Sequence, residues 1–447
     1  MSAWLRTIFP RNLVVRPRTV NAVRSRLIAG PLRPICPQKC GDSGAESARD
    51  IKGMNTMLDA ARRVMTPSAR SDVPAFMVMD VMAAAARIEA AGGRVIHMEV
   101  GQPAAPAPAT AIAAARAALA SGRLGYTETL GIPTLRARIA RHYSDAYGIA
   151  IDPGRVVVTT GSSAGFILAF LALFEPGDRV AIALPGYPPY RHILTALGCE
   201  PVVIETTQAT RWAITPEMLL AAHRKAPLKG VLIASPANPT GTMMTGQALR
   251  DLIAAADGAG IRFISDEIYH GLDYAFPAET AARVSDDVVI INSFSKYFCM
   301  TGWRIGWMVL PEPMVRTIDR LQGNLAISVP TLSQIAAEAA FDGRAEMETV
   351  KHGYEENRRI LLDGLPKAGF EQILPVDGAF YLYADVARFC DDSFAFAQRM
   401  LEETHVAATP GVDFDPLQGR HFIRLSYAGA AAEMREAVER IGTWLKA

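Results

Sequence analysis

From Val156 onward the chain alternates short runs of β-branched and apolar residues with helical stretches, and this rhythm restricts the fold most. Strands separated by helices form a mainly parallel sheet covered on both faces, with ligands at the carboxyl ends of the strands. We therefore predict an α/β fold with a mainly parallel, seven-stranded sheet. The runs are VVVTT (156–160), RVAIA (179–183), VVIE (202–205), GVLIAS (230–235), IRFIS (261–265), VVIINS (288–293) and RIGWMVL (304–310).

A second, smaller α+β region is predicted from about residue 331 to the C-terminus. It begins with helices and continues with a strand at 378–386, a helix near 393–404, a strand at 421–428 and a terminal helix. Before the α/β part, a helical pattern stops at Gly92 and Gly93, and VIHMEV (95–100) follows as a strand. Residues 109–121 and 131–147 also have helical periodicity.

Size and charge favour small-molecule chemistry. With 447 residues, of which 50% are hydrophobic, the chain is long enough for two cores. The net charge of +1 gives no argument for a nucleic-acid surface or a polybasic membrane patch. The longest apolar runs are shorter than the roughly 18 residues that a bilayer-spanning helix requires. Five scattered cysteines lack metal-ligand spacing, which fits a reducing, cytoplasmic compartment.

Residues 1–58 differ from the rest of the chain. Seven arginines and one lysine precede the first acidic residue, Asp42. Such a start is typical of a mitochondrial transit peptide, which would place the protein in the mitochondrial matrix. An over-extended gene start of a cytoplasmic protein, with Met54, Met57 or Met65 as the initiator, is the alternative that we favour. In either case we expect this extension to be disordered.

Four polar motifs follow predicted strands: TTGSSAGF (159–166), SPANPTG (235–241), SDEIYHGL (265–272) and INSFSKYFCMTGWRIGWMVL (291–310). In the last motif, Lys296 lies among serines, aromatic residues and glycines. Poor solvation of an ammonium group lowers its pKa, so such an amine can form a Schiff base with a carbonyl. Taken alone, Lys296 could be a solvated surface charge. Cys299 could be a nucleophile, although a small buried apolar residue is the favoured interpretation.

The turn GSSAG between a strand and an apolar helix predicts an anion site. Backbone N–H groups of Ser162 and Ser163 should point outward at the start of the helix, and their hydroxyls and Arg304 would add donors. A Gly-Ser turn before a helix is common, so the turn alone does not establish phosphate binding.

As a set, and in this order and spacing, the motifs resemble those of class I/II aminotransferases of the pyridoxal phosphate (PLP) fold type I group. The resemblance runs from about Ser71 to the C-terminus. It implies a large PLP-binding domain (99–330) and a small domain made of 59–98 and 331–447. It also implies a homodimeric enzyme of amino acid metabolism, acting in biosynthesis, with amino acids and 2-oxo acids as substrates.

The resemblance assigns a role to each site residue. Lys296 would carry the cofactor and act as the base. Asp266 would face the pyridine nitrogen, Tyr269 and Asn238 its 3-oxygen, and Tyr187 would stack on the ring. The phosphate would be held by Ser162, Ser163, Ser293 and Arg304, and by Tyr126 of the partner subunit. Gly101, Asn238 and Arg424 would bind the substrate, Arg424 through its α-carboxylate.

Several of these residues have plainer interpretations. Asp266 could cap the following helix, Asn238 could serve an ordinary turn, and Tyr187 could pack on its own domain. Arg424 could form an internal salt bridge with an acid of the small domain. Tyr269 and Asp266 count with Lys296 as the predicted catalytic group. No metal site is predicted.

We therefore predict a PLP-dependent aminotransferase that works by a ping-pong cycle. A PLP-dependent lyase or decarboxylase on the same fold is the alternative, because the cofactor site would be shared. A PLP-sensing transcription regulator is a rival of another class, but residues 1–70 are too short for its DNA-binding domain. Ser163 stands where some dicarboxylate-specific relatives carry a lysine, and Phe76 and Met77 hint at an apolar or aromatic side-chain pocket.

Overall fold

The computed structural model describes residues 66–447. The predicted extension, residues 1–58, lies outside the described residues, as does the first part of the 59–98 segment. The described chain from Pro67 to Ala447 forms one compact unit.

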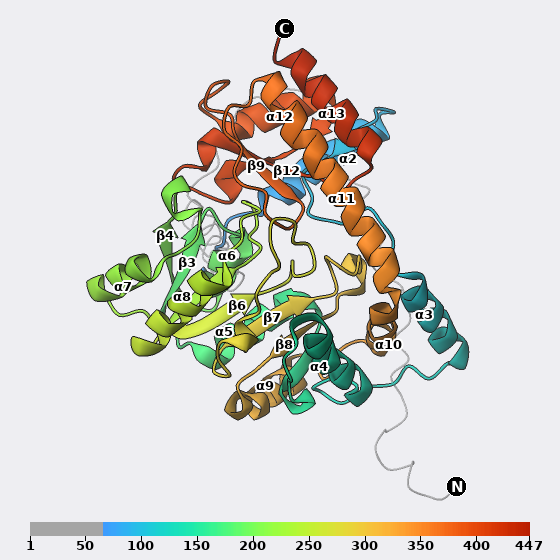
Figure 1. The fold of residues 1–447 in the computed structure, drawn as a ribbon, viewed down its shortest axis with the longest axis vertical. Helices are drawn as coiled ribbons and strands as arrows, with labels where there is room; N and C mark the ends of the chain where they lie inside the picture. Colours follow the sequence, from blue (N-terminus) through green and yellow to red (C-terminus); the bar gives the residue numbers. More distant parts are fainter. Residues whose placement is uncertain (1–65) are drawn as a thin grey trace, which may run out of the picture. The chain divides into compact units, whose positions relative to one another are not determined.

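A seven-stranded sheet forms the centre of this unit (Figure 1). The strand order is β2-β8-β7-β6-β5-β3-β4. Strand β8 runs antiparallel to both of its neighbours, and the other neighbouring strands are parallel. The predicted mainly parallel sheet is therefore confirmed. Its strands are β2 (Val156–Thr159), β3 (Arg179–Leu184), β4 (Glu200–Glu205), β5 (Gly230–Ala234), β6 (Arg262–Asp266), β7 (Val289–Ser293) and β8 (Gly306–Val309).

Both faces of the central sheet are buried. Successive residues of a strand point to opposite faces, so neighbouring residues enter different cores. In β8, Trp307 and Val309 belong to one hydrophobic core, whereas Met308 between them belongs to the other. Phe263 and Ile264 of β6 divide in the same way. This burial on two sides explains why the strands read as continuous apolar runs rather than as alternating ones.

Helices cover the two faces of the central sheet. One core holds side chains from α3 (Ala109–Ser121), α4 (Pro133–Tyr147), α7 (Pro216–Lys225), α8 (Gly246–Gly258) and α10 (Thr331–Ala340). The other holds side chains from α5 (Gly161–Leu173), α6 (Pro188–Ala196) and α9 (Glu312–Leu325). The helix predicted at 109–121 has these bounds, and the one predicted at 131–147 begins two residues later, at Pro133, a residue suited to a first helical turn.

A smaller, three-stranded antiparallel sheet has the order β11-β12-β9. Its strands are β9 (Tyr381–Asp385), β11 (Thr409–Pro410) and β12 (Phe422–Ser426). Beside it, β1 (Ile96–His97) pairs with β10 (Val406–Ala407) in parallel. The strand predicted at 95–100 is thus only two residues long, because the chain continues past Met98 as an irregular segment.

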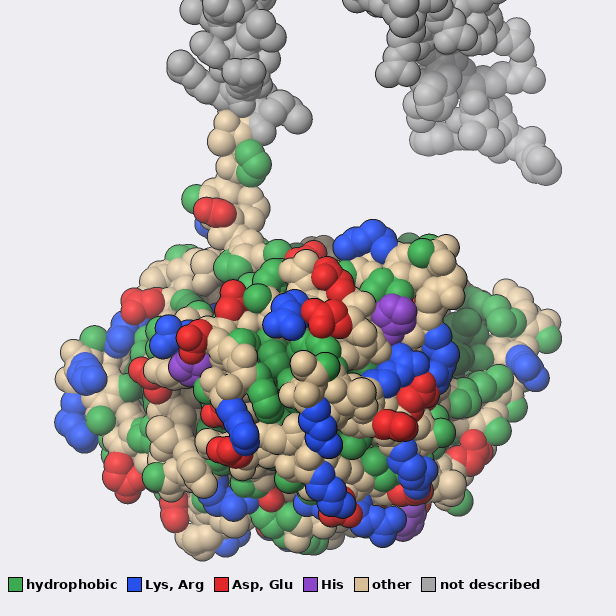
Figure 2. Space-filling model, turned by 90° about the horizontal axis from the view of Figure 1, so that it is seen from above, with side chains coloured by type: hydrophobic (Ala, Val, Ile, Leu, Met, Phe, Trp, Pro, Cys, Tyr) green, Lys and Arg blue, Asp and Glu red, His purple; other side chains and the backbone are tan. Residues whose placement is uncertain are grey.

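The remaining helices pack around the smaller sheet, as Figure 1 shows for α11–α13. They are α2 (Met77–Ala90), α11 (Arg344–Gly364), α12 (Ser393–Thr404) and α13 (Ala431–Trp444). None of the helices described between residues 66 and 447 is both long and apolar enough to cross a membrane. On the face drawn in Figure 2, acidic and basic side chains are interspersed.

Candidate active site

A cavity of about 200 Å³ lies where the loops after β2, β5, β6 and β7 converge. Nine of the predicted site residues line it: Gly101, Ser162, Ser163, Tyr187, Asn238, Tyr269, Lys296, Arg304 and Arg424. Asp266, Ser293 and Tyr126 do not line it. Segments as distant in sequence as Gly101 and Arg424 therefore meet at one site.

Lys296 lies three residues beyond the end of β7, and its Nζ donates a hydrogen bond to the Gly101 carbonyl oxygen at 2.7 Å. Burial of the amine and the nearby charges of Arg424 and Arg304 lower the pKa of Lys296 to about 7, against the opposing effect of Asp266. A substantial share of the amine is therefore neutral near neutral pH, as a nucleophile or base requires.

Ser162 and Ser163 occupy the first turn of α5, where backbone N–H groups lack helical partners. Arg304 reaches the same turn: a Cβ atom at Gly161 would lie 2.5 Å from Arg304 Nη2. Gly161 has a φ of +74°, which a residue with a side chain rarely adopts. The helix N-terminus, two hydroxyls and a guanidinium thus form one corner suited to an anion.

Ser293 lies behind this corner. Its hydroxyl donates to Ser295 Oγ at 2.9 Å, and Ser295 is the serine that lines the cavity. Ser293 also receives a hydrogen bond from the Ser295 backbone N–H at 3.0 Å. The contact of Ser293 with the phosphate therefore stays a prediction, while its hydrogen bond with Ser295 is what the structure shows. Period-two alternation in a strand did not resolve which serine points inward, because Ser293 is the last residue of β7 and Ser295 lies beyond it.

Asp266 ends β6 and is buried. Its Oδ1 accepts a hydrogen bond from the Ile268 backbone N–H at 3.0 Å, and its Oδ2 accepts one from the Tyr190 hydroxyl. Burial raises the pKa of Asp266 to about 7, although both hydrogen bonds oppose the rise. Such a carboxyl is poised to become fully ionised when a cation is placed beside it.

Tyr190 lines the cavity and was not predicted from the sequence. It follows Tyr187 by three residues in the same α6 turn, and the two rings pack edge to face at 5.2 Å. The helical spacing was the available signal, but the contact with Asp266 depends on tertiary structure. Tyr187 itself also packs against Phe76, with ring centroids 6.0 Å apart.

Tyr381 is a second residue that the sequence did not single out. Its hydroxyl and that of Tyr269 lie 2.8 Å apart, and both tyrosines line the cavity. A Cβ atom at Gly101 would lie only 1.8 Å from the Tyr381 hydroxyl oxygen. Because Gly101 has no side chain, Tyr381 fits beside it, and the Gly101 carbonyl lies next to Lys296.

Arg424 lies on β12 and is 2% exposed. One Nη donates to Asn238 Oδ1 at 3.0 Å, and the other donates to Thr409 Oγ1 at 3.1 Å and to the Glu99 carbonyl oxygen. Its guanidinium lies over the rings of Tyr381 and Phe414, at 4.4 and 4.7 Å from their centroids.

No ion pair joins Arg424 to a carboxylate of residues 66–447, and its Nε has no hydrogen-bond partner there. The alternative of an internal salt bridge is therefore wrong for the described residues. A buried guanidinium without a counter-charge, facing a cavity, is suited to bind the carboxylate of a ligand.

Asn238 is buried and follows β5. Because its Oδ1 accepts from Arg424, its amide Nδ2 is left to donate into the cavity. Asn238 thus links the arginine to the centre of the site. Cys299, in contrast, is buried outside the cavity lining, and burial raises its thiol pKa to about 11, so the interpretation as a buried small residue is confirmed.

The outer wall of the cavity is apolar. Phe76, Val78 and Met79 line it from the start of α2. Phe76 therefore lies where the sequence hinted, but Met77 does not line the cavity, and its backbone N–H donates to Asp413 Oδ1 at 3.4 Å. Tyr126 lies in the loop between α3 and α4, is 83% exposed and does not reach the cavity of its own chain.

Comparisons with known proteins agree with this geometry. The family model for class I and II aminotransferases matches residues 94–441. The valine–pyruvate aminotransferase of Mycobacterium tuberculosis is 49% identical over 380 residues, covering 84% of this chain and 97% of the relative. An aspartate aminotransferase of Thermotoga maritima is 32% identical over 381 residues, covering 84% of this chain and 98% of the relative.

Solved structures show the same relationship. The crystal structure of an aminotransferase from Mycobacterium tuberculosis matches with a TM-score of 0.83 and 48% identity, covering 85% of this chain and 99% of the other. The arrangement of the cavity, the family model and these relatives lead to one conclusion. The chain belongs to the class I and II aminotransferases, and it transfers amino groups.

Proposed function

We propose that the cavity holds pyridoxal phosphate and that the protein uses it to transfer an amino group from an L-amino acid to a 2-oxo acid. The observation that carries the proposal is the pairing of Lys296, an amine with a lowered pKa, and Arg424, a buried guanidinium without an acidic partner, in one cavity. One group suits an aldehyde, and the other suits the carboxylate of the substrate.

The donor set of the cavity fits this cofactor. Ser162, Ser163 and Arg304 form the phosphate corner, and Gly161 leaves the space that a Cβ atom would fill. Asp266, which has a raised pKa and accepts a hydrogen bond from the Tyr190 hydroxyl, would face a protonated ring nitrogen. Tyr269 and the free amide of Asn238 would donate to the ring 3-oxygen, and Tyr187 would cover one face of the ring.

When bound, pyridoxal phosphate supplies an aldehyde that captures the amine and a ring that accepts electrons from the α-carbon. Lys296 then takes the proton from the α-carbon with its Nζ and later returns a proton. Its pKa of about 7 lets it do both near neutral pH. Arg424 orients the substrate by a two-pronged contact with the α-carboxylate.

The walls of the cavity favour substrates with apolar side chains. Phe76, Val78, Met79, Val100 and Ile268 contribute apolar surface. The cations that line the cavity are Lys296, Arg304 and Arg424, and each already has a role, so this chain offers no further described cation for a distal carboxylate. The relative named a valine–pyruvate aminotransferase is in line with this class of substrate.

We further propose that the enzyme is a cytoplasmic homodimer in which the exposed Tyr126 completes the phosphate corner of the partner subunit. This tyrosine is exposed and does not line the cavity of its own chain, and both observations support the proposal. A site shared between two copies is common in symmetric dimers.

A half-reaction tests the proposed function. The cofactor-saturated enzyme is mixed with single amino acids, and its absorbance is followed without any oxo acid present. An aminotransferase converts its cofactor once to the amine form and stops, and valine should do this faster than aspartate. A lyase or decarboxylase would instead turn over many equivalents of the amino acid without an acceptor, and this result would refute transamination.

A further inference from the structure

The loop after β7 that carries Lys296 is called the lysine loop below. A second cavity, of about 360 Å³, lies on the other side of this loop. Its walls come from α4, from the segment after β6, from the end of β7 and from the start of α11. Lys296, Arg304 and Arg424 do not line it, so it is separate from the candidate active site. Its volume falls in the range of roughly 300 to 1,000 Å³ that is usual for small-molecule sites.

Arg138 of α4 is the most informative residue of this cavity. Its Nε and Nη1 atoms are buried and form no hydrogen bond with any residue between 66 and 447. The carboxylate nearest to it belongs to Asp145, at 3.6 Å from Nη1, which is longer than a charged hydrogen bond, and that side chain is 49% exposed. An arginine with unsatisfied buried donors costs free energy unless a ligand or water pairs with it.

Arg344, at the start of α11, is the other arginine of the lining, and it forms no hydrogen bond or ion pair within the described part of the chain. The remaining charges of the lining are mostly satisfied. Lys351 pairs with Asp273 at 3.3 Å, and Glu348 accepts a hydrogen bond from the Tyr297 hydroxyl at 2.5 Å. Arg344 therefore has no acidic partner among residues 66–447, and Arg138 has only the long contact with the half-exposed Asp145 of the same lining and keeps two N–H donors unused.

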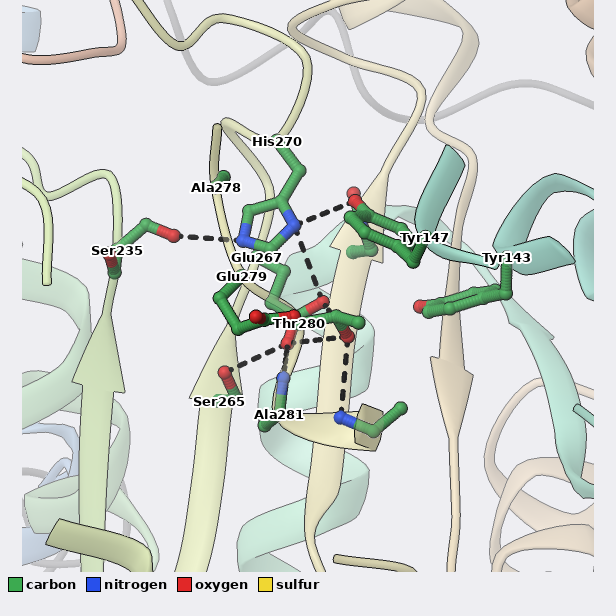
Figure 3. A network of polar contacts seen from close by, with 12 residues as sticks. Tyr143, Tyr147, Ser235, Ser265, Glu267, His270, Ala278, Glu279, Thr280 and Ala281 are labelled. Atoms are coloured by element: carbon green, nitrogen blue, oxygen red, sulfur yellow. Dashed lines mark hydrogen bonds and ion pairs between the residues drawn. The ribbon is translucent and has the colours of Figure 1, made fainter. Parts of the chain in front are cut away.

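Beside Tyr147 and His270, the polar side chains are hydrogen-bonded to one another and to the backbone (Figure 3). His270 Nε2 donates to the Ser235 carbonyl oxygen at 3.0 Å, and its Nδ1 lies 2.8 Å from the Tyr147 hydroxyl. Behind it, Glu267 is buried and accepts hydrogen bonds from Thr280, Ser265 and the Ala281 backbone N–H. This carboxylate is satisfied and does not line the cavity.

His142 shows that the cavity disfavours additional positive charge. Burial, Arg138 and Arg344 lower the pKa of His142 to about 4, so its imidazole is neutral near neutral pH. The floor around it is aromatic. Phe298, Trp307 and Phe341 line the cavity, and the Arg138 guanidinium lies 4.4 Å from the centroid of the Phe341 ring. The cavity thus combines an apolar, aromatic body with two arginines whose N–H donors are largely unused.

We propose that this cavity is a second binding site, for a small monocarboxylate with an aromatic or branched apolar body. Its carboxylate pairs with Arg138 and Arg344, and its apolar part rests on Phe298, Phe341 and Trp307. A guanidinium suits a carboxylate because it offers two parallel N–H donors.

A ligand there would touch the lysine loop from behind. Ser293, Tyr297 and Phe298 line the second cavity and flank Lys296 in sequence, and Ser293 donates to Ser295, which lines the active-site cavity. Occupancy of the second cavity therefore bears on the residues that hold the catalytic amine, without competing for Arg424.

Titration calorimetry with benzoate, on cofactor-saturated enzyme, tests the proposal. Benzoate also suits Arg424, so the titration uses an Arg424→Gln background, in which one binding event should remain. Adding Arg138→Gln or Arg344→Gln should weaken this event at least tenfold. Arg141→Gln, an exposed arginine of the same helix that does not line the cavity, is the matched control and should leave it unchanged.

The variants also separate this site from the catalytic one. With Arg424 intact, Arg344→Gln should leave the rate with amino acid and oxo acid within about twofold, while it removes the second event. Because Arg344 is exposed, this variant is expected to fold even if Arg138→Gln does not. Absence of binding in the Arg424→Gln enzyme, or binding that survives both arginine substitutions, would overturn the proposal. Binding of inorganic phosphate but not benzoate would contradict the ligand class.

Discussion

At the scale of single residues, the chemistry depends on an amine and an arginine that the fold removes from water. Lys296 keeps a pKa of about 7 because burial and two arginines outweigh the attraction of Asp266. Arg424 is buried without a carboxylate partner in the described chain, although it makes three hydrogen bonds to neutral groups. Both residues are therefore poised for a ligand that supplies the missing partner.

The lowered pKa of Lys296 predicts how the cofactor attaches. Only the neutral amine attacks an aldehyde, so the rate at which apoenzyme takes up pyridoxal phosphate should rise as pH increases through about 7 and then level off. Stopped-flow absorbance over pH 5.5 to 10 would measure this. A rate that keeps rising toward the ordinary lysine pKa of 10.5 would show that the amine is not perturbed.

Arg424→Gln should impair substrate binding far more than it impairs the cofactor. Truncating one partner of a buried charge pair typically costs about 2 to 5 kcal/mol, which corresponds to roughly 30-fold or more in kcat/KM. The measurement is kcat/KM with valine and pyruvate, together with the affinity for pyridoxal phosphate. Arg420→Gln, an exposed arginine four residues earlier, is the control and should be near wild type. An equal loss in both variants would argue against the assigned role.

Site residues could be predicted from the sequence where they belong to a motif. They could not be predicted where their role depends on a contact between residues that are far apart in the sequence. Lys296, Asp266, Asn238 and Arg304 lie in recognisable motifs near the ends of strands, and the structure brings all but the buried Asp266 to the cavity wall. Tyr190 and Tyr381 were missed, because their hydrogen bonds to Asp266 and Tyr269 join residues 76 and 112 positions apart. Nothing local in the sequence marks such partners.

At the scale of elements, the start of α5 links the central sheet to the phosphate corner. Gly161 begins the helix with a φ of +74°, and the Arg304 side chain fills the place of its missing Cβ. The strands of the central sheet and the longer helices could be predicted from the periodicity of apolar residues. The two-residue strands β10 and β11 were not, because two residues carry no period and their pairing is set by β1 and β12.

Gly161→Ala should weaken cofactor binding beyond the cost of backbone strain. A side chain in the left-handed region costs roughly 1 to 2 kcal/mol, and here the added methyl group would also displace Arg304. Gly148→Ala is the matched control, because Gly148 has a φ of +67° with no atom within 4 Å of the added Cβ. The thermal unfolding temperature should fall in both variants, whereas the Kd for pyridoxal phosphate should rise only in Gly161→Ala. Similar Kd values in the two variants would contradict the phosphate corner.

At the scale of the whole molecule, our proposal is that the site is complete only in a dimer. Tyr126 is 83% exposed, as a residue offered to a second copy would be in an isolated chain. The N-terminal part of the small domain and the dimer came from the family resemblance, whereas the second region from about residue 331 was predicted from periodicity. They could not be derived from composition, because the chemistry of an interface depends on which surfaces meet.

Mixing two inactive variants tests the shared site. Tyr126→Ala should lack the partner's contact, and Lys296→Ala should lack the amine. After subunit exchange, a mixed dimer keeps one intact site, so an equal mixture should regain roughly a quarter of wild-type activity, since random exchange makes half of the dimers mixed. Size-exclusion chromatography would confirm the dimer. A mixture no more active than the average of its two components would mean that each site is built from one chain.

The most direct test of the whole account is to saturate the purified protein with pyridoxal phosphate, reduce it with borohydride and map the labelled peptide by mass spectrometry. The account predicts one phosphopyridoxyl group per chain, on the ε-nitrogen of Lys296, and none on the Lys296→Ala variant. A protein that takes up no cofactor, or that carries the label on another lysine, would contradict it.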